Sequence, residues 1–590
     1  MGKIAFHRIQ LFSPFAPLNE TFREAKLPDG EESPLKAEAV VQTAARHVEP
    51  QTRPELYRHW KLQVEGAVAR LTMDVKEDGG LSTDYALKLN SYDLSVDIEL
   101  ADAVTRLRFE HPEVSVVVIT SGKDKVFCAG ANIFMLAGST HPFKVNFCKF
   151  TNETRLAMEE ASAESGQVYL AALNGLTSGG GYELALACQE IHLIDDRAST
   201  VSLPEIAFLG VLPGTGGLTR LVDKRHVRRD LADIFSTLAE GVKGKRAVEW
   251  RLVDAVHPPT QWEGAIKERL EALTQTREKR TPVLLEPLEK DPTADGIRYR
   301  HLTLTTKQRV ARLTIHGPGE AAPLPEDPAQ AGCRWYPLEL FRALDDALVE
   351  LRFNFEEIAV VEVRCEGDLE KVMAFDAQLQ QHREHWFVRE TLLLMRRTLK
   401  RMDVTARTFF ALIESGSCFG GFLFELALAA DRSYMLNDRD MMNDQGAPAH
   451  IALSALNDGA FPMGNGLSRL SQRFFHNPAH LLELKAETHP RFDAEQALEA
   501  GLVTVAPDEL DWDDEVRLAI DERASLSPDA LTGMEASLRF AGPETMETKI
   551  FGRLSAWQNW IFQRPNATGE RGALTLYGQP QSPEFDPRRT

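Results

Sequence analysis

Cysteine is scarce in this 590-residue chain: there are six, and none of them forms a CxxC pair. The pattern is neither a disulfide framework nor a zinc signature, and it is typical of a reducing compartment. Long apolar runs are missing too, so we expect no membrane span. The N-terminus, residues 1–36, lacks the sustained apolar core of a signal peptide and is expected to form a tail. These absences indicate a cytoplasmic protein.

Basic residues are fewer than acidic residues in this chain. The chain has 67 Lys and Arg against 87 Asp and Glu, a formal net charge of −20. Nucleic-acid binding depends on basic side chains that neutralise phosphates, so we expect no generic nucleic-acid binding. A small anionic ligand held by a local basic patch remains compatible with this charge.

Nucleotide and metal motifs are missing as well. The stretch PGTGG at 213–217 is not followed by GK[ST], which excludes a Walker phosphate loop and favours the packing of a turn against a helix. No GxGxxG follows a strand-like segment, so a dinucleotide-binding domain is not expected. No clustered set of His and Cys ligands is visible, and we expect no metal.

What the chain does contain is an internal repeat. VARLT occurs at 68–72 and again at 310–314, and ELALA occurs at 183–187 and again at 425–429, both with an offset of 242. Two weaker matches follow in the same order. A solenoid would repeat every 20–50 residues, so this spacing indicates duplication at the scale of a domain.

Each copy alternates strand-like and helical segments. In the first copy, 115–120 and 168–175 are short apolar runs typical of buried strands, and 97–110 is an amphipathic helix. This alternation predicts an α/β fold with a largely parallel sheet. The expected order is an N-terminal tail (1–36), a catalytic domain (37–278), a proline-containing linker (279–298), a second domain (299–506), and a helical C-terminal region ending in an extended surface tail (507–590).

The stretch NGLTSGGGYELALA places Gly179, Gly180 and Gly181 at the start of an apolar helix pattern, with Glu183 in its first turn. Glycines there let backbone approach a ligand closely, and the first N–H groups of a helix have no partners within it. These groups lie at the positive end of the helix dipole and suit an oxyanion hole. Taken alone, the stretch is equally typical of a tightly packed helix start.

Two further motifs flank this stretch, KVFCAGANIFML at 125–136 and LPEIAFLGVLPGTGGLTRL at 203–221. The three motifs, in this order, resemble the crotonase (enoyl-CoA hydratase/isomerase) superfamily over about residues 60–258. The resemblance implies a ββα spiral fold, duplicated in this chain. It also implies an acyl-CoA thioester substrate whose carbonyl oxygen is held by two backbone N–H groups. No separate cofactor is expected, because CoA is part of the substrate.

The resemblance places the two N–H donors at Ala131 and Gly180, and the two acid/base carboxylates at Glu183 and Glu205. Two carboxylates facing one closed pocket raise each other's proton affinity, and burial adds to this. The helix N-terminus near Glu183 acts in the opposite direction. The pair can therefore be split between a proton donor and a proton acceptor.

Cys128, Gly179, Lys123 and Lys125 are weaker candidates for substrate contacts. Cys128 is more typical of a small buried apolar residue. The basic cluster DKRHVRRD at 223–230 could meet the phosphates of CoA, although a solvated helix end is the commoner explanation.

The second copy keeps the helix pattern but loses the chemistry. Phe422 and Leu423 stand where the first copy has Gly180 and Gly181, and KVMAFDAQL at 371–379 has no glycine to expose an amide. IALSALND has no Glu where LPEI is expected. We therefore expect a degenerate domain that packs against the first copy, with an altered second binding site as the alternative.

The whole chain also resembles a family of ring-opening lyases of aerobic benzoate degradation. This resemblance implies that 2,3-epoxybenzoyl-CoA takes up two waters and gives 3,4-dehydroadipyl-CoA semialdehyde and formate. An ordinary acyl-CoA hydratase or isomerase is the first alternative, and a non-catalytic acyl-CoA binding protein is the second. A homodimer is expected, because cyclic two-fold assemblies are the commonest.

Overall fold

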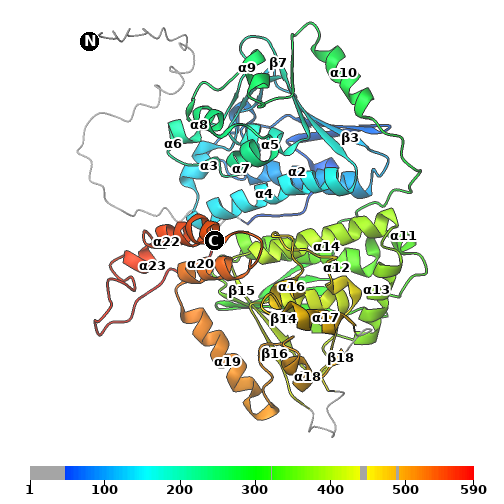
Figure 1. Cartoon of the computed structure of the whole chain (residues 1–590), viewed down its shortest axis with the longest axis vertical. Coiled ribbons are helices and arrows are strands. Elements are labelled where there is room, and N and C mark those ends of the chain that lie inside the picture. The colour runs from blue at the N-terminus through cyan, green and yellow to red at the C-terminus, as the bar shows by residue number, and fades with distance from the viewer. Residues whose placement is uncertain (1–46, 321, 439–447, 487–490) are drawn as a thin grey trace. The chain divides into compact units, whose positions relative to one another are not determined.

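The first half of the chain builds a six-stranded sheet in the computed structural model, which describes residues 47–320, 322–438, 448–486 and 491–590 (Figure 1). The expected tail at 1–36 lies outside the described residues. In spatial order the strands are β1 (Trp60–Glu65), β2 (Val68–Met73), β3 (Val116–Ser121), β5 (Val168–Leu173), β7 (Glu190–Ile194) and β9 (Ala255–His257). Only β1 and β2 pair antiparallel, so the largely parallel sheet predicted from the sequence is confirmed.

Alternate residues of the central strands face two different helical layers. Val117 and Ile119 of β3 belong to the main core, whereas Val116 and Val118 pack against α10 (Trp262–Leu273) on the opposite face. A strand covered on both faces has no polar side, which explains the unbroken apolar run in this segment. The main-core layer contains α2 (Leu94–Phe109) and α4 (His141–Glu164).

A second, three-stranded parallel sheet positions the expected site. Its strands, in spatial order, are β4 (Lys125–Cys128), β6 (Gly175–Ser178) and β8 (Val201–Ser202). Each strand is followed within a few residues by a helix: α3 (Ile133–Gly138), α5 (Gly180–Ala187) and α6 (Glu205–Leu209). Since the carboxyl ends of parallel strands meet at one edge, the segments carrying Ala131, Gly180 and Glu205 converge there.

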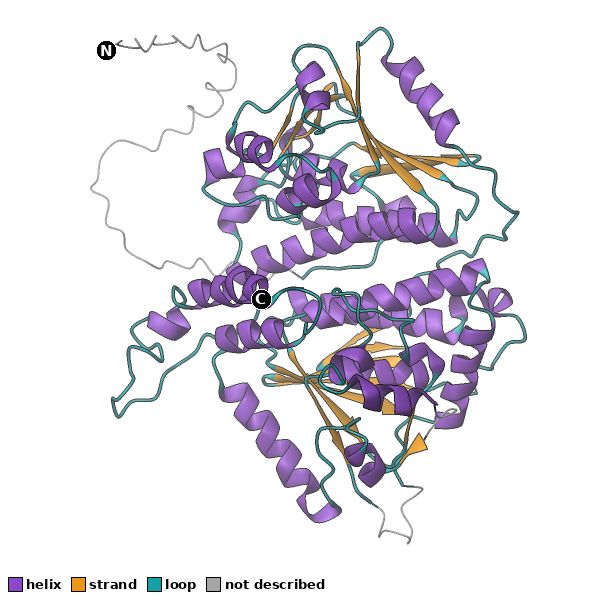
Figure 2. Ribbon diagram, viewed as in Figure 1, coloured by secondary structure: helices purple, strands orange, loops and turns teal. Residues whose placement is uncertain are grey.

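The second half repeats this pattern of pairings in a seven-stranded sheet (Figure 2). Its strands are β10 (Lys290–Thr293), β11 (Gly296–Tyr299), β12 (Leu302–Lys307), β13 (Val310–His316), β14 (Val360–Glu366), β15 (Thr408–Ile413) and β16 (Arg432–Met435). The β12–β13 pair is antiparallel and the β13–β14 pair is parallel, as are β1–β2 and β2–β3. The segment 279–298, expected as a linker, contributes β10 and most of β11, so that expectation was wrong in this respect.

Helices of the second half lie on both sides of its sheet and continue into the C-terminal region (Figure 1). The longer ones are α12 (Tyr336–Phe353), α13 (Leu369–Gln381), α14 (Trp386–Val404), α17 (Pro478–Ala486), α19 (Glu509–Ser525) and α20 (Pro528–Leu538), and shorter ones include α15 (Phe424–Ala429), α16 (Arg469–Arg473), α18 (Ala494–Glu499), α22 (Ser555–Ile561) and α23 (Pro565–Thr568). The helical character expected after residue 507 is present in this region. No helix among these described ranges is long and apolar enough to cross a membrane.

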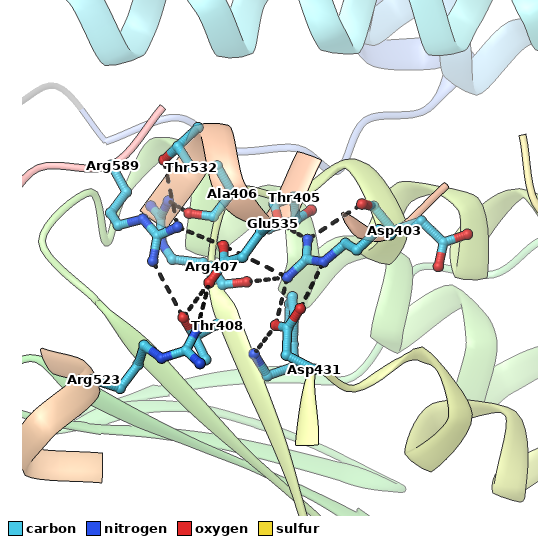
Figure 3. Close-up of polar contacts among 12 residues, drawn as sticks. Asp403, Thr405, Ala406, Arg407, Thr408, Asp431, Arg523, Thr532, Glu535 and Arg589 are labelled. Atoms are coloured by element: carbon cyan, nitrogen blue, oxygen red, sulfur yellow. Dashed lines mark hydrogen bonds and ion pairs between the residues drawn. The ribbon is translucent and has the colours of Figure 1, made fainter. Parts of the chain in front are cut away.

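Most of residues 570–584 are exposed, as expected for a surface tail, but the last two residues of the chain are buried. Arg589 is 1% exposed, and its Nη2 donates to Glu535 of α20 at 2.6 Å (Figure 3). Close by, Arg539 donates to Asp431 at 2.6 Å and to the carbonyl oxygen of Thr405 at 2.9 Å. A buried arginine needs a partner for its charge, and Glu535 and Asp431 provide one for Arg589 and Arg539.

The two halves are joined through α4. Glu160, on α4, accepts hydrogen bonds from Arg396 at 2.7 Å and from Arg397, both on α14, and from Arg108 at 2.9 Å. Burial acts to raise the pKa of Glu160, but the three arginines outweigh it and lower the pKa to about 2. The apolar cores also interlock, since Phe109 of α2 belongs to the core of the second half. The expected packing of the second copy against the first is confirmed.

Glu160→Ala should destabilise the chain strongly, because it removes a carboxylate shared by three buried or partly buried arginines, and Arg108 then keeps Glu390 as its partner. Breaking a buried ion pair costs about 3–5 kcal/mol, so we expect a clear fall in the thermal midpoint. Glu164→Ala, one turn further along α4, is the matched control: its pair with Arg389 is exposed and contributes about 1 kcal/mol or less, and its distance to Arg396 is a longer 3.7 Å. Equal midpoints for the two variants would contradict this account of the junction.

Candidate active site

The loop after β4 and the start of α5 bring the two expected backbone donors together. A Cβ built on Gly130 would lie 3.0 Å from the Gly180 nitrogen and 3.0 Å from the Ser178 carbonyl oxygen. Gly130 has a φ of 93°, which favours glycine, and glycine also permits this close approach. The loop therefore brings Ala131, the next residue, close to the start of α5.

Both N–H groups are left without an acceptor. Neither Ala131 N nor Gly180 N is a donor in any hydrogen bond found among the described residues outside their own elements. Gly180 is the first residue of α5, so its N–H has no partner within that helix either. Two adjacent amides of this kind can bind one oxygen and stabilise negative charge that develops on it.

Glu183 is held by the loop that contains PGTGG. Its Oε1 accepts from the N–H groups of Thr215 at 2.9 Å and Gly217 at 2.8 Å, and its Oε2 accepts from the Thr215 hydroxyl at 2.5 Å. The side chain is 2% exposed. Three donors to one carboxyl group fix its orientation.

The carboxyl group of Glu205 lies in a different environment from that of Glu183. Its Oε2 is buried and has no hydrogen-bond partner among the described residues, and its Oε1 lies against Gly179, where a Cβ would come within 2.6 Å. Burial raises the pKa of Glu205 to about 7; its own backbone N–H lowers it, and the charge of Glu183 raises it further. A carboxyl group with this pKa can both accept and release a proton near neutrality.

The pH dependence of turnover should follow from Glu205. If the protonated carboxyl acts as the acid, kcat/KM falls as pH rises through about 7, because the charged form then predominates. The same shift costs stability at higher pH: the folded state holds the proton more tightly than the unfolded chain, so the contribution is lost between about 4.5 and 7. A kcat/KM profile flat from pH 6 to 8.5 would contradict this assignment.

The weaker candidates divide into two groups. The thiol of Cys128 is fully buried, donating to the Asn90 carbonyl at 3.0 Å and accepting from Gly130 N–H at 3.3 Å. Burial raises its pKa to about 12, so Cys128 supports the loop, as a small buried residue would. Gly179, with a φ of 54°, lies against Glu205 and is part of the site.

The basic residues predicted as substrate contacts either form ion pairs with acidic residues or are exposed to solvent. Lys123 pairs with Asp74 at 3.0 Å, and hydrogen bonds from Lys61 and Lys123 lower the pKa of Asp74 to about 2. Lys125 is exposed at the start of β4. In the 223–230 cluster, Lys224 bonds Glu159 at 2.8 Å, which ties it into the fold. None of these contacts tests a role in CoA binding.

Among the described residues, one cavity and one cluster of possible metal ligands lie away from Glu183 and Glu205. A cavity of about 730 Å³ lies between helices of the two halves, among them α2, α4 and α14, and neither Glu183 nor Glu205 lines it. The residues His47, Glu49 and Glu350 are close enough to share a metal ion. However, the Lys290 ammonium lies 3.0 Å from Glu49 and 2.6 Å from Glu350 and already balances these carboxylates.

Sequence reasoning missed the residues that support the site. The PGTGG loop was interpreted as packing, and its Thr215 and Gly217 turn out to hold Glu183. Tyr92 and Arg155 lie directly behind Gly180: the Tyr92 phenol is in contact with it, and Arg155 donates to its carbonyl at 3.4 Å. Neither residue stands in a recognisable motif, so only the fold reveals them.

In the second half, the backbone N–H that corresponds to Gly180 N–H already donates to a carboxylate. Gly421, with a φ of 49°, takes the place of Gly179, and Phe422 takes the place of Gly180. The Phe422 N–H donates to Asp376 Oδ1 at 2.8 Å. Asp376 lies on α13, which replaces the strand and loop of the first copy. Glu425, the counterpart of Glu183, is paired with Arg469 at 3.1 Å. These contacts support the degenerate interpretation.

A CoA thioester should therefore bind once per chain. Isothermal titration calorimetry with benzoyl-CoA should give a stoichiometry near one, because Asp376 already accepts the hydrogen bond that a second thioester oxygen would need. Two binding events per chain, both retained in a Gly180→Ala variant, would instead favour an altered site in the second half.

The chain is similar to several known proteins. The benzoyl-CoA-dihydrodiol lyase of Aromatoleum evansii is 54% identical over 549 residues, which cover 92% of this chain and 98% of that protein. The fatty acid oxidation complex subunit alpha of Shewanella loihica is 32% identical over 197 residues, covering 33% of this chain but only 26% of that protein. The solved enoyl-CoA hydratase of Geobacillus kaustophilus has 32% identity and a TM-score of 0.33, covering 37% of this chain and 75% of its own.

A family model described as enoyl-CoA hydratase/isomerase matches residues 86–312, which include the loop after β4, α5 and Glu205. The Aromatoleum relative is aligned over nearly its whole length and thus over both halves of this chain. The chain therefore belongs to the benzoyl-CoA-dihydrodiol lyase family, within the enoyl-CoA hydratase/isomerase superfamily.

Proposed function

We propose that the chain opens the ring of 2,3-epoxybenzoyl-CoA. Two waters are consumed, and the products are 3,4-dehydroadipyl-CoA semialdehyde and formate. The observation that carries the proposal is the pairing of two unengaged amides, Ala131 N–H and Gly180 N–H, with two carboxyl groups in unlike environments. The 54% identical relative named benzoyl-CoA-dihydrodiol lyase supports the choice of substrate class.

The proposed chemistry begins at the thioester oxygen. Hydrogen bonds from Ala131 and Gly180 draw electron density from the conjugated ring, which prepares its carbons for addition of water. Glu183 orients a water, and Glu205 moves protons to and from the reacting oxygens. After both waters have added, a carbon–carbon bond breaks in a retro-aldol-like step through an enolate held by the same two amides. One carbon leaves as formate with release of a proton, and the remaining six-carbon acyl chain stays on CoA.

Three further features belong to the proposal. The reaction as written uses no metal and no separate cofactor, since CoA is part of the substrate. A cytoplasmic location is supported by the unpaired cysteines, none of which forms a disulfide among the described residues. We also propose a homodimer, on the general ground that two-fold assemblies are the commonest.

Mass spectrometry of the products tests the reaction. Incubation with 2,3-epoxybenzoyl-CoA should yield formate and the semialdehyde, each carrying oxygen from ¹⁸O-labelled water. Hydration of crotonyl-CoA without turnover of the aromatic epoxide would instead identify an ordinary hydratase. Binding of benzoyl-CoA with no turnover of either compound would indicate a non-catalytic binding protein.

A further inference from the structure

Tyr92 contacts the segments that carry both backbone donors, and its main chain pairs with the loop that holds Ala131. The Tyr92 N–H donates to the Gly130 carbonyl at 3.1 Å, and the Tyr92 carbonyl accepts from Asn132 N–H at 2.8 Å. Tyr92 and Ala131 thus form a parallel β-bridge. In such a pairing, the N–H of the bridged residue points away from the partner strand. Tyr92 therefore fixes the orientation in which the Ala131 N–H is left without an internal acceptor.

The side chain of Tyr92 reaches the second donor. A Cβ built on Gly180 would lie 1.9 Å from the phenol oxygen and 2.8 Å from Cζ, so the phenol abuts the α-carbon of Gly180. Tyr92 is 2% exposed, which leaves the ring little room to move. The phenol therefore limits how closely the start of α5 can approach the loop that carries Ala131.

Arg155 forms hydrogen bonds with both residues of this contact. Its Nη2 donates to the phenol oxygen at 3.2 Å and to the Gly180 carbonyl at 3.4 Å. Its Nη1 is held by Asp97 at 3.2 Å. The guanidinium is 5.7 Å from the centroid of the Tyr92 ring. Because one nitrogen bonds both the phenol and Gly180, the two cannot shift independently.

We propose that Tyr92 is a positioning residue, which sets the spacing of the Ala131 and Gly180 N–H groups so that both reach one thioester oxygen. This inference rests on the proposed function and adds to it the residue that positions the Ala131 and Gly180 N–H groups relative to each other. Tyr92 acts through the backbone of its neighbours, so its removal should weaken polarisation of the carbonyl more than binding of the substrate.

Tyr92→Phe tests the role, because it removes the phenol oxygen and keeps both the ring and the main-chain pairing. We expect kcat to fall about tenfold while KM changes less than about threefold, the pattern of a lost transition-state interaction. The second readout is the infrared carbonyl band of bound [carbonyl-¹³C]benzoyl-CoA, which lacks the epoxide. Wild-type protein should shift this band to lower frequency, and Tyr92→Phe should shift it less.

Tyr182→Phe is the matched control. Tyr182 is also fully buried, lies on α5 two residues after Gly180, and donates its phenol proton to the Leu252 carbonyl at 2.7 Å, away from Ala131. It should keep the wild-type band. A wild-type band and kcat in Tyr92→Phe, or equal losses in both variants, would overturn the proposal. If wild-type protein did not shift the carbonyl band of bound benzoyl-CoA, the oxyanion hole of the proposed function would be contradicted, whatever the role of Tyr92.

Discussion

Glu183→Gln and Glu205→Gln should each lower kcat for 2,3-epoxybenzoyl-CoA by about 10²-fold or more, the usual contribution of general acid–base catalysis. Glutamine at 183 keeps the supporting contacts, since its carbonyl oxygen can still accept from Thr215 N–H and Gly217 N–H. At 205 it removes the proton that the buried carboxyl exchanges near pH 7. The loss is therefore one of chemistry and not of folding. Steady-state kinetics with benzoyl-CoA binding as a parallel measurement will separate kcat from affinity.

Glu249→Gln is the control for these variants, since Glu249 is exposed and pairs only with Lys245 at 3.8 Å. It should behave as wild type. Both active-site variants should still bind benzoyl-CoA with an affinity close to that of wild type. Turnover near the wild-type level in both would leave the two carboxylates without a catalytic role.

Gly180→Ala should lower kcat by about 10²–10³-fold, the effect of losing one oxyanion donor. The new methyl group would lie 1.9 Å from the Tyr92 phenol oxygen, far inside contact distance, so α5 and Tyr92 must move apart. Tyr92 is fixed by its pairing with the Ala131 loop, and the movement therefore separates the two N–H groups. The infrared band of bound [carbonyl-¹³C]benzoyl-CoA should return toward its position in water.

Gly138→Ala is the matched substitution, because a Cβ on Gly138 in α3 meets nothing within 4 Å. It should leave kcat unchanged and favour the helix slightly. Thermal midpoints of the two variants should be compared, so that a loss of folding is recognised. Wild-type kcat in a folded Gly180→Ala protein would show that the Gly180 N–H is not a donor to the reaction.

The sequence predicts the central part of the fold and the site because those features are local. The apolar run of β3 and the glycines before α5 each reflect constraints within a few residues. The residues after β4, β6 and β8 meet because carboxyl ends of parallel strands share one edge. The family resemblance places the two backbone donors at Ala131 and Gly180, and the loop after β4 lies against the start of α5 in the structure.

Features that depend on distant partners were not predictable. Pro292 suggested a linker, yet it lies in β10, an edge strand, where a missing N–H is tolerated. The C-terminal stretch was predicted to be a surface tail, yet Arg589 near its end is buried because it bonds to Glu535. Tyr92 and Arg155 are separated from Gly180 by 88 and 25 residues, respectively, and no periodic pattern or motif connects them to it.

The most direct test of the account is a crystal structure of the chain with benzoyl-CoA bound. We expect the thioester oxygen within about 3.1 Å of both the Ala131 and Gly180 nitrogens, with the carboxyl groups of Glu183 and Glu205 facing the ring. A thioester oxygen bonded to neither amide, or an acyl group bound away from Glu205, would contradict it.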